Sequence, residues 1–213
     1  PRWRATGFGT VFGDFDRDGA LDIAVANGGV RMPQREPTKD VDASDAFWGQ
    51  YAERSQLFAN DGAGRFRDIS EGDPFCTPLA VARGLAVADF NNDGALDLLV
   101  TRVAGPARLY RNVADKRGHW LMVRTLDPSL GGRDAYGAQV VIQAAGKRWK
   151  RSIDPAYSYL CSNDPRAHFG LGQAGHVDAI QVIWPDGVKE SFDGCAADQA
   201  IVLHKGVGPA IGK

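Results

Sequence analysis

The chain has 213 residues, which is enough for one large or two small domains. Its formal net charge of −1 gives it no general attraction to nucleic acid or to an anionic membrane surface, so we expect neither as a partner. No apolar run approaches the length of a membrane span. The chain begins at Pro1, without an initiator methionine or signal peptide, and we therefore expect a processed or truncated chain.

An acidic loop follows the apolar segment 9–12. It reads Asp14-Phe-Asp16-Arg-Asp18-Gly19-Ala-Leu-Asp22. Oxygen-bearing side chains at alternate positions converge when a loop wraps around a hard cation, and Ca2+ takes about 6–8 oxygen ligands. Glycine at the sixth position permits the sharp turn that wrapping requires. The loop therefore predicts a calcium site, and the alternative is an acidic turn between two strands.

The same pattern returns later in the chain. It reads Asp89-Phe-Asn91-Asn-Asp93-Gly94-Ala-Leu-Asp97. The predicted ligands of the first Ca2+ are the side chains of Asp14, Asp16, Asp18 and Asp22 with the carbonyl of Ala20. Those of the second Ca2+ are the side chains of Asp89, Asn91, Asp93 and Asp97 with the carbonyl of Ala95. The second loop carries one carboxylate fewer, so we expect weaker binding there.

Neither loop is an EF-hand. An EF-hand needs a bidentate glutamate at its twelfth position and flanking helices, whereas Val25 and Val100 stand there. The segments on both sides of each loop are short apolar runs rich in valine, leucine and alanine, which favours strands. Each loop is therefore predicted to join two strands of one sheet.

The repeat continues beyond the first loop. Segments 56–60 and 65–69 flank an Asp-Gly turn, which predicts a hairpin, and segment 108–112 matches 56–60 in the second copy. Each unit then holds about four strands, the size of a propeller blade. The spacing between the copies is longer than one blade needs, so we assign the excess to an inserted loop over 28–55. A short helix capped by Ser44 is expected within 44–53.

The remainder of the chain has a different pattern. Segments 119–125, 137–143, 179–184 and 199–203 are apolar or alternating and are separated by Gly, Pro and Asp clusters. They predict a second all-β unit that is a sandwich or a barrel. Segment 147–151, which is basic, is interpreted as the solvated end of a hairpin rather than as a nucleic-acid patch.

Three cysteines leave at least one thiol free or intermolecular in a secreted protein. Cys161 and Cys195 are candidates for a pair, and the alternative is that these two and Cys76 are three small buried hydrophobic residues.

Side chains of the types that hydrolases use for catalysis also lie close together in sequence. The candidates for catalysis are Ser158, Ser162, Asp164 and His168. A catalytic triad is defined by geometry, and the chain has no Gly-x-Ser-x-Gly motif. His168 stands at the head of an apolar strand, which favours a hydrogen-bonded structural histidine.

Residues 1–112 resemble the FG-GAP or VCBS repeats that form calcium-loop blades of integrin-like β-propellers. Three phrases stand in order in the second part of the chain: Tyr136-Gly-Ala-Gln-Val-Val, His168-Phe-Gly-Leu-Gly and Trp184-Pro-Asp-Gly. With these phrases, residues 113–213 resemble the ASPIC/UnbV domain of the cartilage acidic protein family and its bacterial relatives. The resemblance implies extracellular calcium-dependent binding proteins, so we expect a secreted, periplasmic or cell-surface protein.

The sequence therefore predicts an all-β chain with two calcium-loop blades and a C-terminal sandwich or barrel. We expect a recognition or adhesion module for a protein or carbohydrate ligand, in which two Ca2+ ions are structural. The alternatives are an enzyme on the same scaffold, a hydrolase or a cyclase, and a structural subunit that assembles through blade edges. Two blades do not close a propeller, so we expect either self-association or missing upstream blades.

Overall fold

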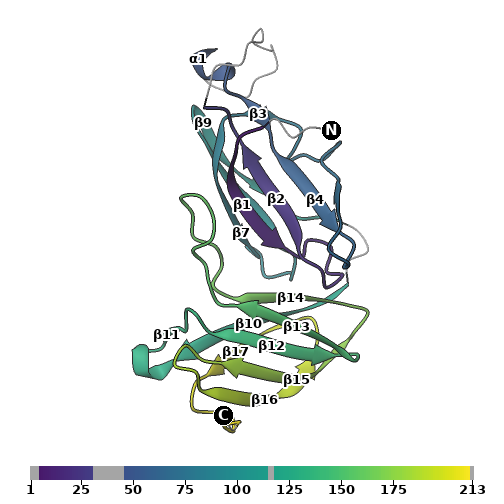
Figure 1. Ribbon diagram of the computed structural model, residues 1–213, viewed down its shortest axis with the longest axis vertical. Coiled ribbons are helices and arrows are strands. Elements are labelled where there is room, and N and C mark those ends of the chain that lie inside the picture. Colours follow the sequence, from purple (N-terminus) through teal and green to yellow (C-terminus); the bar gives the residue numbers. More distant parts are fainter. Residues whose placement is uncertain (1–4, 31–45, 115–117, 212–213) are drawn as a thin grey trace.

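The chain is described by a computed structural model that covers residues 5–30, 46–114 and 118–211. Figure 1 shows two β units stacked end to end, with β1 to β9 in one and β10 to β17 in the other. The sheets of the two units share no strand. The described residues are strands and turns apart from one short α-helix and one 3-10 turn, which confirms the all-β prediction.

The first blade is a four-stranded antiparallel sheet. Its strands, in spatial order, are β1 (Gly7–Gly13), β2 (Asp22–Asn27), β4 (Gln56–Asn60) and β5 (Phe66–Asp68). The first acidic loop joins β1 to β2, as predicted. A small sheet of β3 (Glu53–Arg54) and β6 (Leu79–Ala80) lies beside it.

The expected helix is shorter than predicted. Only α1 (Ala46–Gly49) is helical, and Glu53 lies in β3 instead, where its carboxylate accepts a hydrogen bond from Thr6 N. The predicted cap, Ser44, and most of the inserted loop lie outside the described residues.

The second blade has three strands. They are β7 (Ala82–Ala88), β8 (Asp97–Arg102) and β9 (Gly105–Tyr110), and the second acidic loop joins β7 to β8. In the described part of the chain no fourth strand pairs with β9. The blades pack through β1 and β7, where Val11, Leu85 and Val87 are buried in one apolar cluster. Within the described ranges the two blades do not close into a ring.

The C-terminal unit is a two-sheet sandwich. In one sheet β10 (His119–Asp127) lies between antiparallel β14 (Ala167–Gly172) and parallel β17 (Gln199–His204), and β11 (Arg133–Asp134) pairs with its end after the 3-10 turn Pro128–Leu130. The other sheet runs β13 (Lys147–Ser152), β12 (Gln139–Ala144), β15 (His176–Ile183), β16 (Lys189–Ala196). Trp184 and Phe169 are the largest side chains buried in the core between the sheets.

Two of these strands differ from the sequence prediction. The basic run that was expected at a hairpin end forms the full edge strand β13, paired with β12 over six residues. Strand β16 was not predicted, because its sequence mixes charged residues, glycine and cysteine without strict alternation. Both strands are specified by pairing with an apolar neighbour rather than by their own pattern.

The segment between β13 and β14 connects the two units by hydrogen bonds. Figure 1 shows this segment rising from the sandwich beside β7. Ser158 Oγ donates to Leu85 O at 2.6 Å, and Val87 N donates to Asn163 Oδ1 at 2.9 Å. The ring of Tyr159 packs edge-on against that of Phe8, with centroids 5.0 Å apart. The sandwich is therefore docked on the blades, not merely tethered to them.

All three cysteines are free thiols in this structure. Cys76 is buried in the blade core, and Cys161 lies against Gly84 of β7. Cys195 packs on the sandwich core instead, so the candidate pair of Cys161 and Cys195 is not formed. None of the helices in the described ranges is long and apolar enough to cross a bilayer.

Candidate functional site

The first acidic loop folds back on itself through its own side chains. Asp14 Oδ2 accepts a hydrogen bond from Gly19 N at 3.0 Å, and Asp18 Oδ1 accepts one from Ala20 N at 2.7 Å. Gly19 has a φ of +100°, a conformation that favours glycine. This turn brings one carboxylate oxygen each of Asp14, Asp16 and Asp18 within 4.8 Å of one another. Three of the predicted ligands therefore converge, which makes the loop a candidate metal site.

Asp14 is the buried member of this triad. Its side chain is 0 % exposed, and its Oδ1 has no hydrogen-bond partner among the described residues. Burial raises the pKa of Asp14 to about 7, and the neighbouring charges of Asp18 and Asp16 add to the rise while Arg151 opposes it. A buried carboxylate oxygen without a donor is destabilising unless a proton or a cation satisfies it. The donor set therefore fits a hard divalent cation.

Asp22 has a different role from the triad. Its Oδ2 accepts from Phe15 N at 3.0 Å, and its Oδ1 accepts from Asn60 N at 2.9 Å. Burial raises its pKa to about 6, although these two hydrogen bonds oppose the rise. The Asp22 carboxylate thus fastens the end of the loop to β4. Its role as a ligand, like that of the Ala20 carbonyl, stays a prediction.

The second loop has the same backbone turn, but more of its side-chain oxygen atoms already accept hydrogen bonds. Asp89 accepts hydrogen bonds from Asp93 N and Gly94 N, at 3.1 and 2.8 Å. Asn91 turns its amide nitrogen toward Asp93 Oδ2 at 2.9 Å. Asp97 repeats the role of Asp22, because it accepts from Phe90 N and Asn112 N. The predicted ligands of this loop, Ala95 included, stay a prediction.

Two arginines also approach the second loop. Arg111 Nη2 lies 3.3 Å from Asp93 Oδ2, and Arg17 Nη2 donates to Asp93 O at 2.8 Å. Their positive charge offsets the carboxylates that a cation would need. Sequence reasoning missed both contacts, since Arg17 belongs to the first loop and Arg111 follows β9. The spacing of residues within the second loop predicts neither of these two arginine contacts.

The sandwich reaches each acidic loop at its sixth position. Trp149 Nε1 donates to Gly19 O at 3.0 Å, and His168 Nε2 bonds Gly94 O at 3.0 Å. Because a carbonyl only accepts, His168 Nε2 carries the proton in this contact. Both loop glycines therefore serve twice, in turning the loop and in docking the second unit.

The catalytic candidates do not form a hydrogen-bonded triad. Ser158 donates to a β7 carbonyl, and Asp164 pairs with Arg166. His168 is bonded to Gly94, and burial lowers its pKa to about 4, so its ring is neutral at neutral pH. Ser162 makes no contact that links it to these three in the described structure. Each of the three bonded side chains thus has a structural partner.

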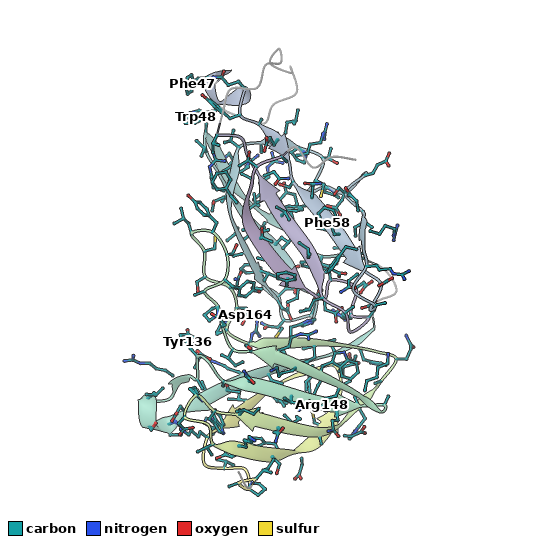
Figure 2. All side chains as sticks on the ribbon, viewed as in Figure 1. Phe47, Trp48, Phe58, Tyr136, Arg148 and Asp164 are labelled. Carbon is teal, nitrogen blue, oxygen red and sulfur yellow. The ribbon has the colours of Figure 1, made fainter. Side chains whose placement is uncertain are left out.

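A cavity of about 290 Å3 lies at the junction of the two units. The end of β1 and its loop form one wall, and the residues after β13 and at the start of β14 form the other. Figure 2 labels Asp164, one of its lining residues, between the two units. His168 and Asp14 line the same cavity. The acidic loop and the histidine that the sequence singled out separately are therefore neighbours in space.

An open pair of blades with acidic inter-strand loops, docked on a β-sandwich, defines a class of repeat protein. Residues 43–100 match the FG-GAP-like repeat, and residues 129–210 match the domain described as ASPIC and UnbV. The chain thus carries an FG-GAP-like repeat followed by an ASPIC/UnbV domain, which confirms the predicted resemblance. The matched repeat includes the second acidic loop, and the first lies outside it.

Among known proteins the chain is similar to cartilage acidic protein 1. Identity is 30 % to the Mus musculus protein and 29 % to the Homo sapiens protein, each over 93 % of this chain. It is 30 % to the Xenopus tropicalis protein over 85 % of this chain. The chain spans about a third of the length of these relatives, 36, 36 and 34 % respectively. This is distant homology across both units.

Proposed function

We propose that this chain is an extracellular recognition module in which calcium rigidifies the loop from Asp14 to Asp22. The observation that carries the proposal is the convergence of three carboxylates on one point, with the buried Oδ1 of Asp14 left without a donor. FG-GAP repeats commonly bind calcium, and the matched repeat contains the second copy of this loop pattern. Carboxylate oxygens are ligands that this ion prefers.

The acidic residues of the first loop have two roles, as ligands and as a clasp of the loop ends. Asp14, Asp16 and Asp18 would supply carboxylate oxygens, while Asp22 keeps the loop closed through Phe15 and Asn60. A bound ion would supply positive charge that lets the three carboxylates stay ionised side by side. The loop also carries the Gly19 carbonyl that accepts a hydrogen bond from Trp149. A rigid loop therefore supports the docking of the sandwich.

The second loop is proposed as a weaker calcium site. It has one carboxylate fewer, and the asparagine in its place already donates to Asp93. Arg17 and Arg111 further reduce the net negative charge at Asp93. Affinity of a calcium loop follows the charge and the freedom of its ligands, so both features act in the same direction.

The name of the relatives supports a place outside the cell, because cartilage is a tissue of extracellular matrix. An adhesion or recognition role agrees with an edge of β9 that no strand of the described ranges covers and with a cavity between two docked units. The ligand is proposed as a protein or a carbohydrate.

Isothermal titration calorimetry of the chelator-treated chain tests the proposal. We expect one tighter calcium site and one weaker site. Magnesium is the control, since its demand for near-ideal octahedral geometry makes it a poorer fit to a loop of this kind. A chain that takes up no calcium at millimolar concentration would contradict the proposal.

One observation favours the enzyme alternative. The junction cavity holds two groups with displaced pKa values, Asp14 raised to about 7 and His168 lowered to about 4, and such groups cluster at active sites. Turnover of chromogenic esters or glycosides that His168→Gln abolishes would establish it. Against it, His168 is bonded to the Gly94 carbonyl and Ser158 to the Leu85 carbonyl, so we keep recognition as the proposed function.

A further inference from the structure

The sheet formed by β12, β13, β15 and β16 turns one face away from the sandwich core. Val140 and Ile142 of β12 lie in the core between the two sheets. Because side chains alternate along a strand, Gln139, Val141 and Gln143 lie on the opposite face, which we call the outer face. Gln143 is exposed and Gln139 is half-buried, so polar side chains of the outer face reach solvent.

Strand β13 places two cations beside these glutamines. Arg148 pairs with Gln143, and Lys150 pairs with Val141, so both cations lie on the outer face. Lys150 Nζ donates to Gln139 Oε1 at 3.4 Å, which brings its head group over β12. Figure 2 labels Arg148 on this sheet. We call the four polar side chains of Arg148, Lys150, Gln139 and Gln143 the basic strip.

The cations of the basic strip have no carboxylate partner in the part of the chain that the structure describes. Arg148 and Lys150 are exposed, and neither lies in an ion pair there. In the same unit Arg124, Arg166 and Lys205 each pair with an aspartate. The positive charge of the basic strip is therefore available to an external anion.

The acidic residues of this sheet lie away from the basic strip. Asp178 and Asp193 belong to β15 and β16, which β12 separates from β13. Neighbouring strands lie about 4.8 Å apart, so the backbones of β13 and β15 are about 10 Å apart. That exceeds the Debye length of about 8 Å at physiological salt. The first acidic loop meets β13 through Trp149, on the opposite side of the strand.

The glutamines add neutral hydrogen-bonding groups to the cations. A primary amide both donates and accepts, as a hydroxyl group does, so Gln139 and Gln143 suit hydroxyl groups. An arginine or a lysine suits a carboxylate or another oxyanion. The basic strip therefore fits a chain-like ligand that carries hydroxyl groups and anionic groups close together, which is the chemistry of an acidic polysaccharide.

Other partners fit the basic strip less well. Protein partners are bound mainly through aromatic and apolar anchors, and the exposed large hydrophobic residues include none from these four strands. Charged side chains on an edge strand oppose the addition of a peptide strand to β13. Single-stranded nucleic acid needs aromatic rings on which its bases stack, whereas Trp149 of β13 lies on the other side of the strand.

We propose that the basic strip binds an acidic polysaccharide, with Arg148 and Lys150 on its anionic groups and Gln139 and Gln143 on its hydroxyl groups. The inference rests on the proposed recognition function and narrows its ligand to one class. The basic strip contains none of the predicted calcium ligands, so it binds its ligand without calcium.

Calorimetric titration of the whole chain in chelator tests the proposal. The probes are heparin oligosaccharides, which carry sulfate and carboxylate groups, and oligogalacturonate, which carries carboxylate groups alone. We expect binding of at least one probe that weakens as salt is raised, because exposed charges are screened. Uncharged dextran and single-stranded poly(dT) are the comparisons. No binding of either acidic probe, equal binding of dextran, or tighter binding of poly(dT) would overturn the proposal.

Replacing both cations, by Arg148→Gln with Lys150→Gln, should weaken polysaccharide binding about tenfold or more, because two charged donors are lost. The matched control is Arg67→Gln with Arg133→Gln, which removes the same charge from exposed positions of β5 and β11. An equal loss of affinity in both double variants would show that net charge alone is responsible, and would overturn the assignment to the basic strip.

Nuclear magnetic resonance of the unaltered chain gives a second readout that needs no variant. The side-chain amide resonances of Gln139 and Gln143 should shift when the bound polysaccharide is added, and those of Gln173, outside the four strands, should not. Shifts at Gln173 without shifts at the two glutamines of β12 would contradict the site.

Calcium uptake is measured separately on the same samples, because oligogalacturonate itself offers carboxylate oxygens to Ca2+. A chain that takes up calcium and binds no polysaccharide would contradict the basic strip alone. A chain that binds polysaccharide in chelator and takes up no calcium would contradict the calcium loop alone.

Discussion

Trp149 donates its indole Nε1–H to the carbonyl of Gly19 at 3.0 Å, across 130 residues of sequence. The donor lies in an edge strand of the sandwich, and the acceptor is the turn glycine of the first acidic loop. His168 and Gly94 repeat the relationship at the second loop. The two loops are thus contact surfaces between the units as well as candidate cation sites.

Trp149→Phe should lower the free energy of unfolding by about 1 kcal/mol, because it deletes this one hydrogen bond and keeps most of the apolar contact. For a chain of this size that corresponds to a fall of about 2–4 °C in melting temperature. Trp48→Phe in α1 is the control, and urea unfolding followed by circular dichroism gives the measurement. An unchanged midpoint would show that the contact contributes nothing.

Asp16→Ala removes one carboxylate of the triad. We expect calcium affinity at the tighter site to fall about tenfold or more, since affinity follows ligand charge. The second site should be unchanged. Asp193→Ala, at an exposed position of β16, is the matched control. Equal calorimetric traces for the two variants would remove Asp16 from the site.

Stability of the chain without calcium should fall as pH rises from about 4 to about 7. Burial raises the pKa of Asp14 to about 7 and that of Asp22 to about 6, so the folded state holds two protons that the unfolded state has released, against the one proton that the unfolded state gains at His168, whose folded pKa is about 4. The contribution of these two carboxyl groups to the free energy of unfolding is complete below their unfolded-state pKa. It is lost as the pH rises through their folded-state pKa. Thermal melts in chelator at several pH values measure this slope.

Calcium should reverse that dependence, because the ion competes with protons for the same oxygens. At a concentration 100 times Kd it should add about 2.7 kcal/mol of stability. Asp14→Asn should flatten the slope in chelator. Melting curves that are identical in calcium and in chelator at every pH would mean that the loops are ordinary turns.

Gly170→Ala should disturb the docking of the sandwich. A Cβ at this position would lie 2.1 Å from Asp14 Oδ2 and 2.6 Å from Arg17 Cα. Overpacking of this kind costs about 1–3 kcal/mol. Gly175→Ala is the control, because a Cβ there meets only His119 Nε2 at 3.8 Å. Comparable unfolding midpoints for the two variants would show that the junction accommodates the added methyl group.

The open edge of β9 should pair with another chain or with neighbouring blades. β9 pairs only with β8 in the described ranges, and Leu109 in it is 56 % exposed. An unpaired edge is a template for strand addition. Light scattering should therefore report a species larger than 22.9 kDa at micromolar concentration. Leu109→Lys should reduce that mass, since an edge lysine opposes strand pairing.

A monodisperse species of 22.9 kDa, with slow amide exchange along residues 108–112, would show that the edge is covered from within.

The two acidic loops and the strands around them follow from local sequence patterns. Alternating oxygens with glycine at the sixth position is a local pattern, and a loop of this kind folds through contacts among its own residues, as Asp14 with Gly19 shows. Apolar runs such as those of β2 and β8 are strands because both faces are covered. The phrases around His168 and Trp184 identified the second unit in the same way.

The difference between the two loops, and the contacts between the two units, depend on long-range packing. Arg111 near Asp93, and Arg151 near Asp14, are brought together by the docking of separate strands, and no spacing in the chain encodes them. The basic strand β13 illustrates the same limit. Its basic sequence indicates a solvated hairpin end, whereas in the fold the half-buried Trp149 donates a hydrogen bond to Gly19 O. Long-range contacts depend on where each sheet ends, which local periodicity does not specify.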